Sequence, residues 1–384
     1  MQLSVIILNY NVKHFLEACI SSVQKAIATL DAEIIVVDNA STDGSKEMMK
    51  DVFPTITYLY QTTNAGFPKG NNIGVTKAKG KYICILNPDT IVAGNTFEAI
   101  LKHITTLPNF GILGCKLIDG SGNFLPESKR GIPTPWVAFT KVTGLYNVFP
   151  KIKLFNQYYA QDIDENENGK VSILVGAFMF LEKQLYEKVG GFDEDCFMYS
   201  DDIDLSYLSL KEGKQNYYFS DVRCIHFKGE STLKDGTYMK RFKEAMQFFY
   251  KKHFKVSPFF NGMMNLGITL FAFKKKTEKR QKVKQPDHYI LVSKNATVYN
   301  QLKQKYHFSI DWVQYLEDVL TLDNPQKTIE VLVDNATVSY QDYINFIEKN
   351  KKSNKTFKIK PENAPFFVGS NHKNDKGEIL EVHY

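Results

Sequence analysis

The sequence predicts an α/β protein in which a Rossmann-like domain is followed by a smaller α/β domain. Between Leu3 and Leu86, apolar runs of strand length alternate with segments whose apolar residues recur at helical spacing. Polar or acidic residues directly follow the strand-like runs, and a second, shorter alternation begins after Pro286. Such alternation implies parallel sheets covered by helices on both faces, with ligands bound at the carboxyl ends of the strands.

The first half of the Rossmann-like domain has the most regular pattern. Leu3–Leu8 is a continuous apolar run of the kind that buried parallel strands show. A helix is expected after it, and another over Phe67–Ala78. The other strands predicted in this half are Glu33–Val37, Ile56–Tyr60 and Tyr82–Leu86.

The second half is less regular and is rich in aromatic residues. Residues 132–159 have no clear period, and their rings suit stacking on sugar rings, a lipid interface or packing in a core. The elements expected after them are a strand over Val171–Leu181, a helix near Lys183–Val189, a helix from near Asp202, a strand over Val222–Ile225 and a helix over Phe242–Phe254.

The pattern divides the chain into an N-terminal domain over residues 1–255, a connecting segment over 256–285 and a small α/β domain over 286–384. In the connecting segment, the apolar stretch Phe259–Phe273 is too short to span a bilayer and precedes a lysine-rich run. This favours an interfacial helix against anionic lipid, the alternative being a helix packed on the N-terminal domain. The last domain is expected to contain strands over Tyr289–Val292 and Thr328–Val333 and helices over Val298–Tyr306 and Tyr340–Lys351.

Composition narrows the class of protein and its location. The formal charge of +6 over 384 residues is mild, which argues against a nucleic-acid partner. Five cysteines without a C-x-x-C spacing argue against a disulfide framework or a zinc site, and favour a reducing compartment. The N-terminus has neither the basic lead nor the cleavage site of a signal peptide. We therefore expect a cytoplasmic protein.

Two segments at predicted strand ends suit a nucleotide. Asp38 closes the second strand, where a carboxylate accepts hydrogen bonds from a base or a ribose. Alternatively, Asp38 only builds the turn, and Ser41 or Thr42 caps the next helix. The glycine-rich segment Asn64–Gly74 lets backbone amides approach an anion, with Lys69 near a phosphate, although a plain loop before a helix has the same composition.

Acidic residues at two further places suit transfer chemistry. Asp89 follows the fourth strand and could hold a divalent ion that offsets the charge of a diphosphate. Asp201, Asp202 and Asp204 lie at a predicted helix start, where their mutual repulsion favours a general base. His226, after a later strand, suits a metal ligand. Alternatively, Asp89 only forms a strand-end turn, Asp202 caps a helix beside surface charges, and His226 is a structural histidine.

The order of these segments resembles the family 2 glycosyltransferases, most closely their bacterial rhamnosyltransferase-like branch. The resemblance covers Gln2 to His253. It implies a GT-A fold, a nucleotide-diphospho-sugar donor and inverting transfer by single displacement. The segments that carry it are Ser4–Tyr10, Val36–Gly44, Asn64–Gly74, Asn87-Pro88-Asp89, Gly176-Ala177, Gly190–Leu205 and His226–Ser231.

The resemblance also implies the roles of individual residues. Asp202 would be the general base, with Asp201 and Asp204 beside it, and Asp89 with His226 would hold Mn²⁺ or Mg²⁺. Together with Lys69, the expected nucleotide-sugar-binding residues are Asn9, Tyr10, Asp38, Asn64, Phe67, Asn71, Asn87 and Asp89.

Three departures from the family pattern concern the same site. Asp201 replaces the usual glutamate before the base, and Asn87 replaces the first aspartate of the metal motif. The arginine often found shortly after the carboxylates is absent from Leu205–Leu210.

The resemblance leaves open a deoxythymidine-diphosphate sugar, such as the rhamnose donor, or a uridine-diphosphate sugar. The expected acceptor is a saccharide or lipid-linked saccharide, and the expected location includes the cytosolic face of the inner membrane. Two other functions are the alternatives. A nucleotidyltransferase would carry a basic, glycine-rich loop where Asn9-Tyr10-Asn11 stands. A non-catalytic nucleotide-sugar-binding scaffold would lack Asp89 or Asp202.

Overall fold

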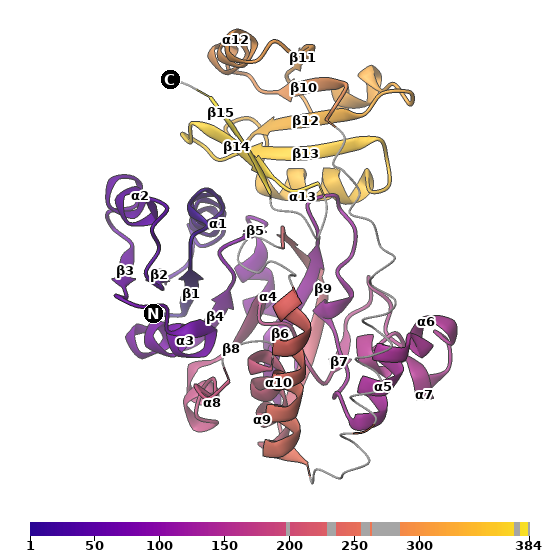
Figure 1. Ribbon diagram of the computed structural model, residues 1–384. Helices are drawn as coiled ribbons and strands as arrows, with labels where there is room; N and C mark the ends of the chain where they lie inside the picture. Colours follow the sequence, from indigo (N-terminus) through magenta and orange to yellow (C-terminus); the bar gives the residue numbers. More distant parts are fainter. Residues whose placement is uncertain (197–199, 229–235, 255–261, 263–284, 372–376, 383–384) are drawn as a thin grey trace.

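The computed structural model describes residues 1–196, 200–228, 236–254, 262, 285–371 and 377–382. It contains two sheets, the smaller one stacked on one end of the larger domain (Figure 1). The larger sheet has the order β3-β2-β1-β4-β8-β6-β9-β5, with β7 paired to β9, and the smaller has the order β11-β10-β12-β13-β14-β15. The predicted α/β class, with a Rossmann-like part followed by a small C-terminal α/β part, is confirmed.

One half of the larger sheet is parallel, as the apolar runs predict. Its strands are β1 (Leu3–Asn9), β2 (Ala32–Asp38), β3 (Thr57–Tyr60) and β4 (Tyr82–Leu86). Helices α1 (Lys13–Ala26) and α2 (Ser45–Val52) cover one face, and α3 (Gly66–Lys77) covers the other. Successive side chains of β1 therefore enter two different cores, with Val5 packed on the α1 side and Ile6 on the α3 side.

The start of α2 differs from the expectation. Gly44, at a φ of 84°, precedes the helix, and no side chain caps it. Ser41 instead accepts hydrogen bonds from Asn9 Nδ2 at 3.0 Å and from the Asn11 amide at 2.9 Å. The expected cap by Ser41 or Thr42 is therefore wrong, because Ser41 is used to join the ends of β1 and β2.

The other half of the larger sheet is mixed. Its strands are β5 (Thr90–Val92), β6 (Phe110–Ile118), β7 (Gly169–Val171), β8 (Phe178–Glu182) and β9 (Gln215–His226). Its helices are α4 (Thr96–Ile104), α8 (Lys183–Lys188), α9 (Asp201–Lys211) and α10 (Gly236–His253). The predicted strand Val171–Leu181 is interrupted, because β7 ends and β8 begins on either side of a turn that contains Gly176. Strand β8 runs antiparallel to β4 and β6.

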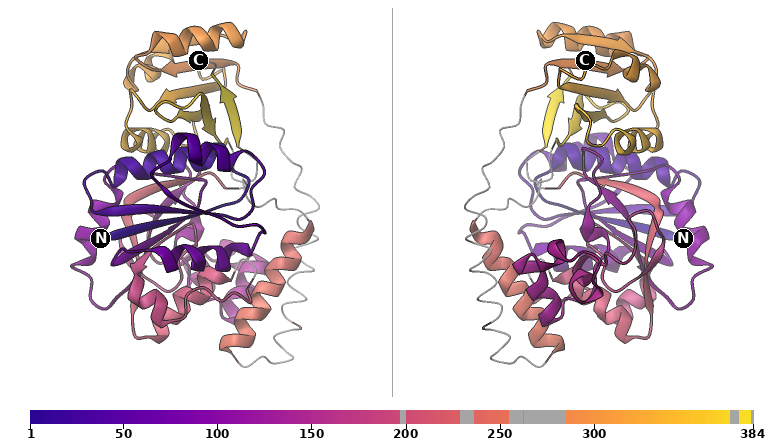
Figure 2. Two further views of the ribbon diagram at one scale, coloured as in Figure 1. Left: turned by 90° about the vertical axis from the view of Figure 1, so that its left-hand side faces the viewer. Right: turned by 90° about the vertical axis from the view of Figure 1, so that its right-hand side faces the viewer.

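The aromatic segment forms a lobe on the side of this half (Figures 1 and 2). It consists of η1 (Pro126–Ser128), α5 (Pro135–Thr143), α6 (Leu145–Val148), α7 (Lys153–Asn156) and η2 (Gln157–Tyr159). The five elements are short, which agrees with the lack of a clear period in the sequence.

The smaller sheet has four parallel strands and two antiparallel ones at one edge. The strands are β10 (His288–Val292), β11 (Ile310–Val313), β12 (Ile329–Asp334), β13 (Lys355–Lys360), β14 (Phe366–Gly369) and β15 (Glu378–Glu381). Helix α12 (Ala296–Lys305) covers one face, α13 (Tyr340–Lys349) covers the other, and η3 (Glu317–Leu322) follows β11.

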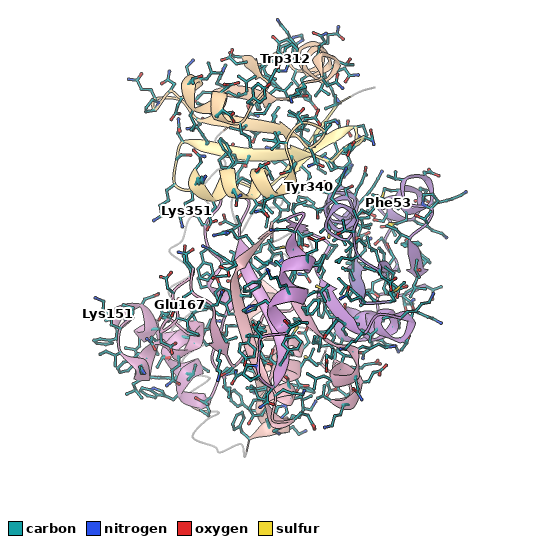
Figure 3. The ribbon with its side chains drawn as sticks, turned by 180° about the vertical axis from the view of Figure 1, so that it is seen from behind. Phe53, Lys151, Glu167, Trp312, Tyr340 and Lys351 are labelled. Atoms are coloured by element: carbon teal, nitrogen blue, oxygen red, sulfur yellow. The ribbon has the colours of Figure 1, made fainter. Side chains whose placement is uncertain are left out.

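The two parts of the chain share a hydrophobic core. Ile91, Ile225 and Phe227 of the larger domain belong to the same buried cluster as Ile344 and Ile347 of α13. Figure 3 shows Tyr340 where α13 meets the larger domain. Helix α13 therefore packs directly on β5 and β9.

A buried charge network lies beside this core. Lys116 Nζ is almost inaccessible and contacts Glu348 Oε1 at 2.6 Å, while Arg223 Nε contacts the other oxygen of Glu348 at 2.6 Å. These contacts connect β6 and β9 to α13. Of the predicted connecting segment, only residues 262 and 285 are among the described residues, so the expected interfacial helix over Phe259–Phe273 lies outside them.

Candidate active site

Parallel strands β2, β1 and β4 end side by side, and polar residues follow each of them. Asn9 lies opposite Asp38 in the strand register, and its Nδ2 donates to Asp38 Oδ2 at 2.7 Å. The other oxygen of Asp38 accepts the Ser41 amide at 2.7 Å. Both residues are fully buried, while Tyr10 next to them is exposed. Asn9 Oδ1 is buried and has no hydrogen-bond partner within the described residues, so it is available to a ligand.

Helix α3 brings a second set of predicted residues to this edge. Gly70 allows its close approach, because a Cβ there would lie 2.4 Å from Leu8 Cδ1. Asn71 Nδ2 donates to the Phe67 carbonyl at 2.9 Å, while Asn71 Oδ1 is buried and unpartnered in the described part of the chain. Asn64 and Lys69 are exposed at the start of this helix.

Asp89 and His226 meet because β5 pairs with the end of β9. Thr90 lies opposite His226 in the antiparallel register, and the Phe227 amide donates to the Asp89 carbonyl at 3.0 Å. As a result, His226 Nε2 lies 3.3 Å from Asp89 Oδ1 and 3.3 Å from Asn87 Nδ2. Asn87 and Asp89 thus form one cluster with His226, although His226 follows them by 139 and 137 positions.

This cluster fits a divalent metal with few protein ligands. Adjacent ligands on an octahedral ion with bonds of about 2.1 Å are roughly 3.0 Å apart, close to the separation of Asp89 Oδ1 and His226 Nε2. Within the described ranges, no group of three or more His, Cys, Asp or Glu side chains is arranged to bind a metal. The chain therefore offers Asp89 and His226, and a bound diphosphate would have to complete the coordination.

Asp202, at the start of α9, is held by one oxygen only. Its Oδ2 accepts from Arg130 Nη2 at 2.6 Å and from the Gly176 amide at 3.0 Å. Its Oδ1 is buried and has no hydrogen-bond partner among the residues described. A carboxylate fixed through one oxygen, with the other available, has the geometry that a general base needs.

The loop before β8 connects Asp202 to the metal-side cluster and to α3. The Asn87 amide donates to the Ala177 carbonyl at 3.0 Å, next to the Gly176 amide that binds Asp202. On the other side, the Phe67 ring lies 3.4 Å from the position of a Cβ on Gly176. The predicted donor, metal and base residues thus converge on one edge of the sheet.

Arg130 is the site residue that the sequence analysis missed. It follows η1 and makes an isolated β-bridge with Ile173. Burial lowers the pKa of its guanidinium, but the Asp202 carboxylate outweighs this effect and the pKa is raised. The family pattern expects an arginine after the carboxylates. In this chain an arginine reaches the base from a segment 72 positions earlier, which no local motif could have indicated.

The three neighbouring carboxylates do not form one group. Asp204 is fully buried against α10, where Lys252 Nζ donates to Oδ2 at 2.9 Å and His253 Nε2 lies 2.5 Å from Oδ1. Asp201 is buried at the first position of α9. Since both oxygens of Asp204 are engaged by α10, its geometry is that of a structural anchor between two helices.

Comparison with known proteins identifies the family of the first half of the chain. The sequence model of the family described as Glycosyl transferase family 2 matches residues 4–190. Residues 4–190 are a family 2 glycosyltransferase domain. The resemblance to this family and the glycosyltransferase class are thereby confirmed, whereas the predicted metal dependence stays a prediction.

Several individual proteins are similar to this glycosyltransferase. N-acetylglucosaminyl-diphospho-decaprenol L-rhamnosyltransferase of Mycobacterium tuberculosis is 24% identical over 244 residues, which are 61% of this chain and 78% of the relative. The low-salt glycan biosynthesis hexosyltransferase Agl10 of Haloferax volcanii is 24% identical over 229 residues, 58% of this chain and 66% of the relative. Among solved structures, a mannosyltransferase of Pyrobaculum calidifontis in complex with GDP-Man and Mn²⁺ is similar to this chain. The match covers 72% of this chain and 76% of the mannosyltransferase chain, with 20% sequence identity and a TM-score of 0.45.

A second ion pair flanks the metal-side cluster of the glycosyltransferase. Lys228, at a φ of 57°, pairs with Glu127. Burial raises the pKa of Glu127, but the Lys228 ammonium outweighs it and lowers the pKa to about 2. This pair joins η1 to the residues after β9, and so connects the segment that carries Arg130 to the segment that carries His226.

Proposed function

We propose that the protein is an inverting, metal-dependent glycosyltransferase that moves a sugar from a nucleotide-diphosphate donor to a saccharide or lipid-linked saccharide acceptor in cell-surface polysaccharide synthesis. The observation that carries the proposal is the convergence of a one-sidedly held Asp202 with the Asp89–His226 cluster at one sheet edge. The mycobacterial relative is an L-rhamnosyltransferase by name, which favours a rhamnose donor, and a uridine-diphosphate sugar is the alternative.

Asp202 acts as the general base in this proposal. Its Oδ1 accepts the proton of the acceptor hydroxyl while the hydroxyl oxygen bonds to the anomeric carbon. The bond from that carbon to the diphosphate breaks on the opposite side, which inverts the configuration. Arg130 and the Gly176 amide hold Oδ2, and therefore keep the plane of the carboxylate fixed during the transfer.

Asp89 and His226 would hold the divalent ion, Mn²⁺ or Mg²⁺. When bound, this ion supplies the positive charge that stabilises the departing diphosphate. The side-chain oxygens of Asn9 and Asn71 face the nucleotide, since both are buried and lack partners among the described residues. Asp38 contributes by fixing Asn9 through their hydrogen bond.

The domain boundaries at residues 255 and 285, and a peripheral location on the cytosolic face of the inner membrane, belong to the same proposal. A lipid-linked acceptor would be met at a bilayer surface, and the relative's name specifies such an acceptor for that protein. No described helix combines the length and apolar character needed to cross a bilayer.

The test is release of nucleoside diphosphate from a panel of nucleotide sugars with Mn²⁺ or Mg²⁺. We expect one donor to be hydrolysed, with loss of release in chelator and in Asp89→Asn. Asp202→Asn should bind the donor, measured by calorimetry, but transfer no sugar. Donor binding without transfer by the wild-type chain to any saccharide or lipid-linked acceptor would instead indicate a scaffold.

A further inference from the structure

The lobe formed by η1 to η2 exposes a cluster of large apolar side chains. Val148 is 66% exposed, Phe149 40%, Ile152 47% and Leu154 54%, and Trp136 beside them is 38% exposed. We call these five residues the apolar face of the lobe. Exposed apolar residues are normal when scattered, but five within 19 positions form a patch that requires an explanation.

The apolar face is built on a packed base. The Phe155 ring lies 5.8 Å from that of Trp136 and 5.2 Å from that of Phe149. Trp136 Nε1 donates to the Leu154 carbonyl at 2.8 Å, which joins α5 to α7. The exposed side chains are therefore held by a defined framework of rings and are not at the tip of a loose loop.

Only some of the charged side chains of the lobe reach its face. Lys129 and Arg130 are buried, Lys141 lies over the Tyr158 ring, and Glu127 of η1 pairs with Lys228, while the exposed Asp162 and Asp164 follow η2. Lys151 and Lys153 alternate with Ile152 and Leu154 and are themselves exposed. Figure 3 shows Lys151 at the outer edge of the lobe, far from Trp312 at the other end of the molecule.

The inner side of the lobe lies against the active site. Tyr158 is buried, and burial raises its pKa, but the cationic groups of Lys141 and Arg130 outweigh this and lower it. Lys141 Nζ lies 3.8 Å from the centre of the Tyr158 ring. Because Arg130 also binds Asp202, the inner side of the lobe is in direct contact with the proposed general base.

We propose that the apolar face of the lobe is the surface by which this protein docks on an anionic lipid bilayer. Aromatic and aliphatic side chains enter the headgroup boundary, and Lys151 with Lys153 contacts the lipid phosphates. Trp136 has the amphipathic character that favours this interface. The inference rests on the proposed function, because docking here presents the Asp202 side of the domain to an acceptor held in the bilayer.

A bilayer fits this face better than a protein partner. Protein interfaces gather aromatic residues and arginine in a core and are depleted in lysine. Here lysines alternate with aliphatic residues along residues 151–154. A flat anionic surface accepts both, since the ammonium groups reach phosphates while their neighbours enter the acyl boundary.

Flotation of the purified full-length protein with vesicles tests the proposal. Vesicles of phosphatidylcholine containing phosphatidylglycerol should carry the wild-type chain, and phosphatidylcholine alone should carry much less. The variant Ile152→Ser/Leu154→Ser should bind roughly tenfold more weakly, given the apolar area removed. The matched control is Leu320→Ser/Ile379→Ser, whose side chains are 53% and 43% exposed on the smaller domain, and it should bind like the wild type.

The proposal would be overturned if the full-length chain did not bind anionic vesicles. It would also be overturned if the two double variants bound equally, or if the lobe variant floated with the vesicles as much as the wild type does. Thermal melting confirms that each variant is folded. Release of nucleoside diphosphate in vesicle-free buffer is measured in parallel. If the wild type releases nucleoside diphosphate but does not float with the vesicles, only the docking surface is refuted. If the wild type releases no nucleoside diphosphate, the proposed function is refuted.

Discussion

Arg130 Nη2 donates a hydrogen bond of 2.6 Å to Asp202 Oδ2, and the same nitrogen donates to the Leu174 carbonyl at 3.0 Å. One guanidinium group therefore fixes both the proposed base and the backbone that leads to β8. The ion pair is buried, and each partner compensates the charge of the other.

Replacing Arg130 by glutamine should impair both stability and turnover. The free energy of unfolding should fall by about 3 kcal/mol, because an unpaired carboxylate is left in a buried place. The value of kcat should fall at least tenfold, while the KM for the donor should change little. Steady-state kinetics and thermal melting check these expectations. The control is Lys129→Met, which removes a buried cation bound to the carbonyls of Ala160 and Ile163 and should leave kcat unchanged.

Asp204→Asn should give the opposite profile to Asp202→Asn. Asp204 binds Lys252 and His253, so the variant should lose about 3 kcal/mol of stability and retain kcat within a few-fold. Asp202→Asn should abolish transfer. Turnover and chemical denaturation of the two variants separate these roles, and a silent but fully stable Asp204→Asn would place this residue in the catalytic set.

Glu17 gives the unfolding free energy a pH dependence. Burial on α1 raises the pKa of Glu17 from 4.5 to about 7, with Lys13 opposing the shift. A raised carboxyl pKa contributes stability below pH 4.5 that is lost as the pH rises through 7. Relative to Glu17→Gln, the wild type should therefore lose about 3 kcal/mol between pH 4.5 and 8. Denaturant titrations at several pH values measure this difference, and equal pH dependence of the wild type and Glu17→Gln would contradict the prediction.

Gly122→Ala should weaken the contact between the two domains. Gly122 has a φ of 82°, and a Cβ there would lie 2.4 Å from the Ile347 carbonyl oxygen on α13. Gly213 has a φ of 74° and open space around it, so Gly213→Ala imposes similar backbone strain without the clash. We expect Gly213→Ala to cost about 1 kcal/mol of stability and Gly122→Ala to cost more.

The same pair of variants tests whether α13 positions the metal-side residues. Helix α13 packs on β5 and β9, which hold Asp89 and His226 next to each other. Only Gly122→Ala should therefore raise the Mn²⁺ concentration that gives half-maximal turnover. Equal metal dependence in both variants would show that the smaller domain does not support this cluster.

The sequence predicts the strand ends well and the long-range contacts poorly. Apolar runs followed by polar residues located Asp38 and Asp89, because strand ends are local features. The pairing of β5 with β9 and the approach of Arg130 depend on segments far apart in the chain. The capping prediction for Ser41 failed for a related reason, since its partner Asn9 lies on another strand.

The larger domain, whose residues 4–190 match the family, shares a hydrophobic core with the smaller domain. Ile91, Ile225 and Phe227 are buried by the residues of α13 and its sheet. A recombinant fragment that stops before residue 286 would turn this core into water-exposed surface, and would retain Lys116 and Arg223 without their common partner Glu348. The catalytic half should therefore be insoluble when produced alone, and recover solubility when the C-terminal half is co-produced as a separate chain.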